Sequence, residues 1–285
     1  MAIITVQNLR KQYGDKIAVK DVSFSVEEGE IYGIVGRNGA GKTTTVECVS
    51  GLRRPDGGTV SVDVDDIKQQ VGVQLQESMM PDKLRVREAL DLYASFYANP
   101  APVQTLLDEV GLDPNVAFAK LSGGQRQRLS IALALVGNPK VAILDELTTG
   151  LDPQARRETW DLITRIRDRG VTVLLVTHFM EEVERLCDRV AVISQGVVLT
   201  VDTPAGLIAR SGGLQRVTFR STVPVDRLKD LPEVHSVTVE AGQVTVTGDE
   251  NVLRAVVTAL PATAVSNIKT ETGSMDDAFL ALTGE

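Results

Sequence analysis

The segment "EIYGIVGRNGAGKTTTVECVSGL", residues 30–52, constrains the fold more than any other part of the chain. An apolar run predicts a buried strand, a glycine-rich loop follows it directly, and a helical pattern then runs to Gly51. The loop has the spacing G-x-x-x-x-G-K-[ST], in which glycines let backbone N–H groups approach phosphates at a helix N-terminus. The flanking strand and helix argue against a chance glycine-rich turn, so we expect an α/β fold with a phosphate site.

The side chains of this loop have separate expected roles. Lys42 would reach the β and γ phosphates of a bound nucleotide, and Thr43 would ligate Mg²⁺ through its hydroxyl. The other loop residues expected to bind the nucleotide are Gly36, Asn38, Gly39, Ala40, Gly41 and Thr44.

Two acids end the apolar run "VAILDE", residues 141–146. Ligands of open parallel sheets lie at the carboxyl ends of strands, so both acids are expected to face the nucleotide. Asp145 would hold Mg²⁺ through water, and Glu146 would act as general base on the attacking water. The alternative is a solvated strand end, which becomes unfavourable once a phosphate loop is present.

A second possible phosphate site occurs at "LSGGQRQRLS", residues 121–130. Ser122 and Gln125 have the spacing of a capping box, and Gly123 and Gly124 open the helix that follows. The sequence therefore predicts two helix starts able to bind phosphate in one chain.

Composition limits the remaining functions. The formal net charge is −8 without a basic block, which argues against a nucleic-acid partner. The two cysteines are isolated and predict reduced thiols rather than a disulfide framework. No run approaches the ~18 apolar residues of a membrane-spanning helix, and the N-terminus lacks the pattern of a secretion signal.

The change of pattern near residue 210 predicts two domains. Residues 1–210 carry all the motifs above, with a helical subdomain at about 80–138, where apolar residues follow helical spacing. Residues 211–285 predict a small α+β accessory domain, of the order βαββαβ, with Ser274 and Asp277 capping its last helix. No catalytic constellation is visible in this second part.

The motifs together resemble those of ABC-type ATPases. The phosphate loop, "LSGGQ", "VAILDE" followed by "GLD", and "VTH" occur in that family's order, over roughly residues 3 to 210. The stretches "HFMEEVERLCDRVAVISQG" and "DDAFLALTGE" resemble the ATP-binding subunits of drug and antibiotic exporters of the ABC-2 type. The resemblance implies a RecA-like P-loop core with an antiparallel β subdomain and a helical subdomain, with ATP and Mg²⁺ as cofactors.

The resemblance assigns four further residues. Tyr13 matches the aromatic residue that stacks on adenine, although an ordinary edge-strand tyrosine is the alternative. Gln76 matches the glutamine that senses Mg²⁺ and contacts the transporter, with the neighbouring Gln74 as the other candidate. Asp152 matches the acid that communicates between subunits. His178 matches the histidine that contacts the γ-phosphate and holds the catalytic geometry.

One position departs from the family, because Leu147 stands where proline usually follows the catalytic glutamate. The resemblance also answers why one chain has two phosphate-type helix starts. In ABC ATPases two chains pack head to tail, and Ser122 and Gly124 of one chain would cap the γ-phosphate held by Lys42 of the other. Binding of two ATP molecules would close the dimer, and hydrolysis would let it open.

The resulting expectation is an ATPase that powers export of a small molecule, drug-like compound or lipid. Its expected partners are a second ATPase chain, as a homodimer, and a separate transmembrane permease, with no nucleic acid. The expected location is the cytoplasm, peripheral on the inner face of the cell membrane. The alternatives are a soluble ABC ATPase acting on DNA or ribosomes and a nucleotide-binding regulator without turnover; the presence of Glu146 and His178 argues against the second.

Overall fold

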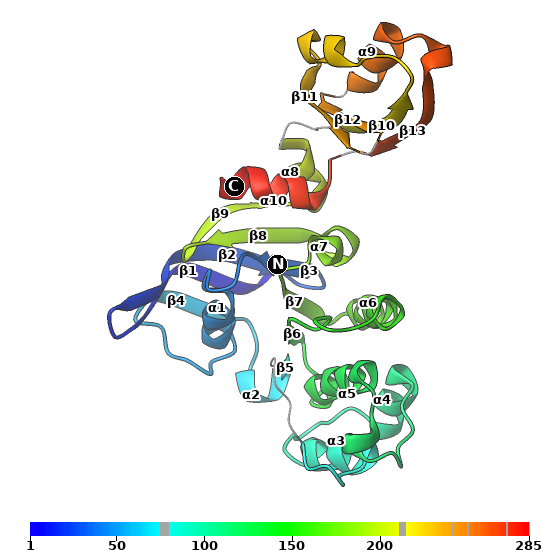
Figure 1. Cartoon of the computed structure of the whole chain (residues 1–285). Helices are drawn as coiled ribbons and strands as arrows, with labels where there is room; N and C mark the ends of the chain where they lie inside the picture. The colour runs from blue at the N-terminus through cyan, green and yellow to red at the C-terminus, as the bar shows by residue number, and fades with distance from the viewer. Residues whose placement is uncertain (75–79, 211–214, 241, 250, 272, 285) are drawn as a thin grey trace. The chain divides into compact units, whose positions relative to one another are not determined.

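The computed structural model describes residues 1–74, 80–210, 215–240, 242–249, 251–271 and 273–284 (Figure 1). The chain divides into two units, Met1–Thr203 and Pro204–Glu285. The sequence places this boundary seven residues later, at 210/211. The earlier division reflects helix α8 (Pro204–Arg210), which packs against α10 (Met275–Thr283) within the second unit.

A nine-stranded sheet forms the first unit, in the order β4-β1-β2-β9-β8-β3-β7-β6-β5. Strand β1 pairs antiparallel with both β4 and β2. The last five strands in this order, from β8 to β5, form a continuous run of parallel pairs. The strands are β1 (Ala2–Tyr13), β2 (Lys16–Glu27), β3 (Ile31–Val35), β4 (Gly57–Val62), β5 (Val71–Gln74), β6 (Val141–Asp145), β7 (Thr172–Thr177), β8 (Arg189–Ser194) and β9 (Val197–Asp202).

The parallel strands place the predicted chemical groups together. Every residue of β3, β6 and β7 is buried, which confirms the interpretation of their apolar runs as central strands. Strand β7 lies between β3 and β6, and Val176 is in register with both Ile34 and Asp145. The carboxyl ends of these three strands therefore lie at one edge of the sheet. The phosphate loop follows β3 there, Glu146 follows β6, and His178 follows β7.

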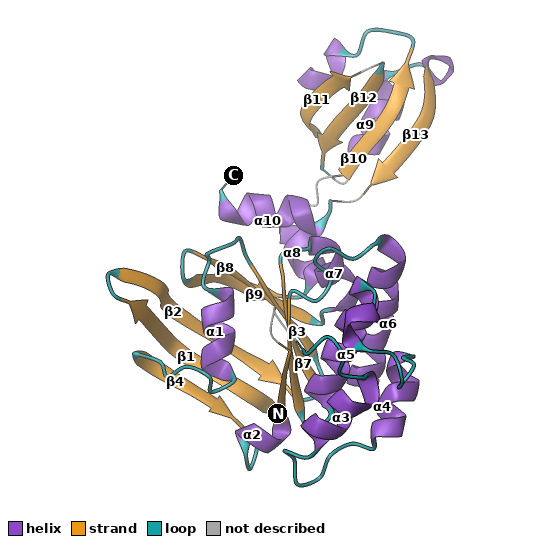
Figure 2. Cartoon of the chain, turned by 60° about the horizontal axis from the view of Figure 1, so that its bottom comes forward, coloured by secondary structure: helices purple, strands orange, loops and turns teal. Residues whose placement is uncertain are grey.

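Helices cover the sheet of the first unit (Figure 2). Helix α1 packs against β1, β2 and β4, while α6 and α7 pack against β7. The predicted helical subdomain contains α3, α4 and α5, which contact one another. Helices α2, α7 and α8 were not predicted. The helices are α1 (Lys42–Val49), α2 (Ile67–Gln70), α3 (Val86–Ala94), α4 (Val103–Val110), α5 (Gly123–Leu135), α6 (Pro153–Asp168) and α7 (Met180–Leu186), with a 3₁₀ turn at Phe118–Lys120.

The second unit contains a four-stranded antiparallel sheet in the order β11-β12-β10-β13. Its elements are β10 (Gln215–Ser221), a 3₁₀ helix (Asp226–Asp230), β11 (Val234–Glu240), β12 (Gln243–Gly248), α9 (Val252–Ala259), a short 3₁₀ turn (Ala262–Ala264) and β13 (Val265–Glu271). This is the predicted βαββαβ order, except that a five-residue 3₁₀ helix replaces the first α-helix. Val217, Phe219 and Val256 belong to its separate apolar core.

The predicted helix caps are present in both units. The Ser122 hydroxyl accepts a hydrogen bond from the Gln125 N–H, and the Gln125 side chain accepts one from the Ser122 N–H. Ser274 and Asp277 form the same reciprocal arrangement at the start of α10. Among the described residues, every helix is too short or too polar to span a bilayer.

Candidate nucleotide-binding and catalytic site

The phosphate-type loop requires glycine at two positions. Gly41 precedes α1 with φ 105°, a backbone conformation that residues with side chains rarely adopt. A Cβ atom at Gly36 would lie 2.3 Å from the Ile193 carbonyl oxygen, so no side chain fits between the loop and β8. No side chain caps the first turn of α1, whose N–H groups are therefore available to an anion.

The Lys42 side chain folds back across this loop. Its Nζ donates hydrogen bonds to the carbonyl oxygens of Gly36, at 2.7 Å, and of Arg37, at 3.2 Å. Burial lowers the pKa of Lys42, while the negative charges of Glu146 and Asp145 oppose that shift. A buried ammonium group thus lies beside unpaired helix N–H groups, and this combination favours a multiply charged anion.

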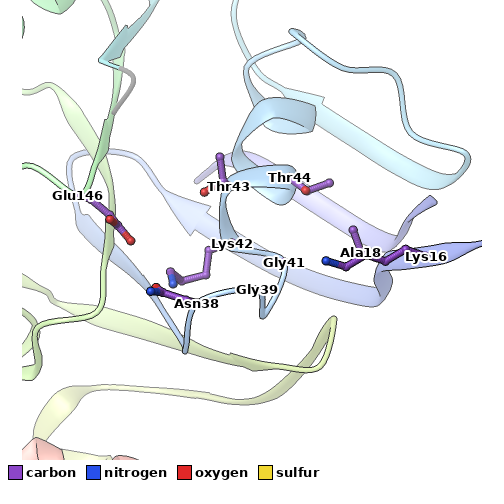
Figure 3. A pocket seen from close by; sticks show the side chains of 9 residues that line it. All are labelled: Lys16, Ala18, Asn38, Gly39, Gly41, Lys42, Thr43, Thr44 and Glu146. Carbon is purple, nitrogen blue, oxygen red and sulfur yellow. The ribbon is translucent and has the colours of Figure 1, made fainter. Parts of the chain in front are cut away.

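A pocket opens in front of the loop (Figure 3). It is lined by Lys16, Ala18, Asn38, Gly39, Gly41, Lys42, Thr43, Thr44 and Glu146. Six of the eight loop residues predicted to bind the nucleotide are in this lining, whereas Gly36 and Ala40 are buried and do not line the pocket. Lys16 and Ala18 were missed by the sequence analysis, because only the β1–β2 hairpin brings them to the loop.

Tyr13 lies beside this pocket without lining it. It pairs with Lys16 across the β1–β2 hairpin, and its side chain is partly exposed. Two cations contact its ring, with Lys11 Nζ at 5.7 Å and Arg53 Cζ at 5.4 Å from the centroid. These contacts restrict the Tyr13 ring at the end of β1.

Asp145 is almost completely buried at the end of β6, with 1% of its surface exposed. Its side chain is hydrogen-bonded with Thr43, and its backbone N–H donates to Gln74 Oε1 at 3.1 Å. Its Oδ1 atom has no hydrogen-bond partner among the described residues. Burial, with a further contribution from Glu146, raises the pKa of Asp145 to about 6. The described part of the site therefore holds a buried carboxylate oxygen without a hydrogen-bond partner, with the charge of Lys42 nearby.

Glu146 and His178 meet at the same edge of the sheet. His178 Nδ1 lies 3.3 Å from Glu146 Oε1, and Glu146 faces Lys42 and Thr43 across the pocket (Figure 3). Glu146 has φ 48°, an uncommon conformation for a residue with a side chain. Leu147, which follows it, is buried, so side-chain packing holds this turn where the family usually has proline.

The second helix start forms a different pocket. It is lined by Ser122, Gly123, Gly124, Gln125, Arg128, Gly150, Leu151, Asp152, Gln154, Ala155 and Glu158. No residue of this lining belongs to the first pocket. Asp152 also caps α6, since its carboxylate accepts the N–H groups of Gln154 and Ala155. The structure thus brings the "LSGGQ" motif together with Asp152, away from Lys42.

Gln76 lies outside the described residues. The alternative glutamine, Gln74, is buried, and its Oε1 accepts the Asp145 backbone N–H. The Gln74 side chain therefore links the end of β5 to the end of β6.

We expect the nucleotide-free chain to become more stable against unfolding when Asp145 is changed to Asn. The pKa is about 6 when folded and 3.8 when exposed, so the folded chain gains stability as pH falls through 6 and the gain is complete below 3.8. At pH 7 the ionised carboxylate therefore costs up to ~3 kcal/mol, taking about 1.4 kcal/mol per pKa unit. Urea denaturation at pH 5 and pH 7 measures the effect. At pH 7 the variant should be more stable than the wild-type chain, and its stability should change less than that of the wild type between the two pH values. Asp82→Asn, at an exposed carboxylate, is the control, and an equal pH response in both variants would contradict the prediction.

The comparisons with known proteins agree with this geometry. Residues 19–149 match the family model described as "ABC transporter". The chain is 44% identical over 223 residues to a Nod factor export ATP-binding protein I of Burkholderia orbicola (strain AU 1054), covering 73% of each chain. A protein of the same name from Burkholderia pseudomallei (strain K96243) is 35% identical over 100% of this chain and 98% of its own length.

Solved structures give the same assignment. An ATP-binding subunit of an ABC transporter matches 74% of this chain and 93% of its own, with 27% identity and a TM-score of 0.65. A dimeric ATP-binding cassette in a post-hydrolysis state, bound to ADP and Pi, matches 70% of this chain and 98% of its own, with 26% identity and a TM-score of 0.62. The phosphate loop, the acids after β6 and the separate "LSGGQ" pocket are thus parts of an ATPase, and the chain belongs to the ABC transporter family as an ATP-binding subunit.

Proposed function

We propose that the chain works as one half of an ATP-driven dimer that powers export through a separate membrane permease. The two pockets carry this proposal. Each has a helix start able to bind phosphate, yet they share no lining residue. Relatives named Nod factor export ATP-binding protein support an export role, and the cargo class is a small molecule, drug-like compound or lipid. The same relatives do not favour an ATPase that acts on DNA or ribosomes.

A second copy of the chain would complete each nucleotide site. Lys42 of one chain holds the β and γ phosphates, and Ser122 and Gly124 of its partner cap the γ-phosphate from the opposite side. The similarity to a dimeric cassette bound to ADP and Pi supports this arrangement. ATP contacts both chains only in the closed dimer, so its binding favours closure, and loss of the γ-phosphate favours opening.

The chain's own residues divide the hydrolysis reaction between them. Glu146 accepts the proton of the attacking water, and His178 holds Glu146 and contacts the γ-phosphate. Lys42 leaves its carbonyl partners in the loop and neutralises charge on the phosphates. Tyr13 stacks on the adenine, and Asp152 contacts the partner chain beside the "LSGGQ" motif. Lys16 and Ala18 extend the pocket between the phosphate and base positions.

The donor set beside Lys42 fits Mg²⁺. Thr43 supplies a hydroxyl, and Asp145 supplies a buried carboxylate oxygen without a hydrogen-bond partner among the described residues. Hard oxygen ligands together with phosphate oxygens are those that Mg²⁺ prefers. Bound there, the ion would neutralise charge on the β and γ phosphates. Gln76 is the further proposed ligand and the link from this site to the permease.

The helical subdomain presents the proposed permease surface. Leu92, Tyr93 and Phe96, at the end of α3, expose 49%, 37% and 65% of their surfaces. Three apolar side chains that lie within five positions form a patch typical of a protein interface. A peripheral site at the cytoplasmic face of the membrane follows from docking there. Arg87, on the same helix, is less suited to contact a permease, because it donates a hydrogen bond to Gln104 on α4.

We expect Leu92→Asp with Phe96→Asp to detach the chain from membranes that contain its permease while basal ATPase activity stays within about twofold. The carboxylates would face an apolar partner surface and lose hydration there. Membrane flotation and co-purification of the permease with the tagged chain measure the effect. Leu280→Asp, at a 44% exposed position of the second unit, is the matched control. Unchanged membrane binding of the double variant would show that this surface does not contact the permease.

A further inference from the structure

A buried carboxylate outside both pockets is unexplained by the roles above. Glu182, on α7, has 1% of its surface exposed and lines neither pocket. Its Oε1 atom accepts hydrogen bonds from the Thr148 hydroxyl and from the Trp160 indole nitrogen, the latter at 3.1 Å. Its Oε2 atom has no hydrogen-bond partner among the described residues. A carboxylate is costly to bury with incomplete partners, so packing alone does not account for it.

The partners of Glu182 come from the segments that carry the reaction. Thr148 lies two residues after Glu146, and Glu182 lies four residues after His178. Trp160 adds a third element, the middle of α6. A single carboxylate oxygen therefore ties the turn after β6 to the helix after β7.

The turn that Glu182 holds is strained. Glu146 has φ 48°, and a residue with a side chain keeps that conformation only when its surroundings enforce it. On one side, the Glu146 N–H donates to the Val176 carbonyl oxygen at 2.9 Å. On the other side, the next side-chain anchor is the bond from Thr148 to Glu182. The two anchors bracket the residue proposed to be the general base.

We propose that Glu182 is a positioning residue for ATP hydrolysis, acting through Thr148 on the backbone of Glu146 and through α7 on His178. The proposal rests on the roles proposed above for Glu146 and His178. Glu182 touches neither pocket, so its removal should misplace the reacting groups without weakening ATP binding. A shift of the general base by about 1 Å is enough to cost a large factor in rate.

Two substitutions of similar volume test the link from its two ends. Glu182→Leu and Thr148→Val should each lower kcat at least ~10-fold and leave the KM for ATP within about twofold, because Lys42 and Thr43 are untouched. Both break the same bond, so the double variant should lose little more than the worse single variant. Glu182→Gln keeps an oxygen for both donors and should restore most of the kcat.

Fluorescence of Trp160, the chain's only tryptophan, distinguishes a loss of positioning from a loss of folding. The Trp160 indole N–H donates a hydrogen bond to Glu182, so the fluorescence of Trp160 reports on the surroundings of the Glu182 carboxylate. Thr148→Val should leave that emission unchanged while kcat falls. If Glu182→Leu does not fold, Thr148→Val alone carries the test. Glu181→Gln, at a side chain that is 68% exposed on the same helix, is the matched control and should keep wild-type kcat.

The outcomes distinguish this proposal from the function on which it rests. Wild-type kcat in folded Thr148→Val, or additive losses in the double variant, would overturn the positioning role. A rise in KM at constant kcat would overturn it as well. Inactive Glu146→Gln beside fully active Glu182 and Thr148 variants would overturn the positioning alone. Full turnover in Glu146→Gln would overturn the assignment of Glu146 and, with it, the positioning of that residue.

Discussion

Glu146→Gln is expected to bind ATP normally and to lose at least ~100-fold in turnover, the lower range for removal of a general base. Lys42, Thr43 and Asp145 remain, so the groups proposed to hold the nucleotide are unchanged. Glutamine keeps the volume and a hydrogen-bond acceptor for His178 but cannot take a proton from water. In the proposed cycle, closure requires ATP and opening requires its hydrolysis, so the variant should accumulate as an ATP-bound dimer.

Single-turnover hydrolysis and size-exclusion chromatography with ATP measure these two effects. Glu28→Gln, which removes an exposed carboxylate that lines neither pocket, is the control and should behave as wild type. Hydrolysis near the wild-type rate in Glu146→Gln would take the general-base role away from this residue. Slow hydrolysis without a nucleotide-dependent dimer would leave that role in place and count against closure by ATP.

The parts of the core and of the candidate site that depend on residues close together in the sequence could be predicted from local patterns. The loop before Lys42 needs its glycines at fixed spacing, because they let a phosphate approach the backbone N–H groups closely. Ser122 and Gln125 cap each other within one helical turn, so their spacing alone predicted the contact. The apolar runs before Glu146 and His178 predicted central strands, and central strands place their carboxyl ends together.

Contacts between distant segments were not predictable in this way. Lys16 lines the nucleotide pocket only because the β1–β2 hairpin folds over the loop. The bond from Thr148 to Glu182 joins residues 34 positions apart, and no spacing rule applies over that distance. Helix α7 (Met180–Leu186) was not predicted, because seven residues are too few for apolar spacing to distinguish a helix. The left-handed backbone of Glu146 has no signal in its residue type.

Lys42→Ala and Gly124→Asp are each expected to abolish ATPase activity, and mixing the two is expected to restore part of it. The first substitution removes the ammonium group proposed to hold the β and γ phosphates. The second places a carboxylate in the pocket proposed to cap the γ-phosphate of the partner's nucleotide. In a dimer of one variant, every composite site contains one of the two changes, so both sites are inactive.

The mixed dimer differs because its sites are unequal. One site combines both changes, while the other combines an intact Lys42 with an intact Gly124. Random pairing of equal amounts gives about half mixed dimers, so independent sites would restore about a quarter of wild-type activity. Strict coupling between the two sites would lower that fraction, so nucleotide trapped per dimer should be measured beside turnover, and one trapped nucleotide per mixed dimer is expected.

A steric control completes this experiment. A Cβ atom at Gly124 would lie 3.1 Å from Ala155 Cβ, so any side chain there is slightly crowded. Gly124→Ala introduces the same crowding without charge and should keep more activity than Gly124→Asp. A single chain that used its phosphate loop and its own "LSGGQ" motif on one nucleotide would show neither recovered turnover nor single-site trapping on mixing. The two pockets share no lining residue, so in the proposed dimer a partner chain supplies the second half of each nucleotide site.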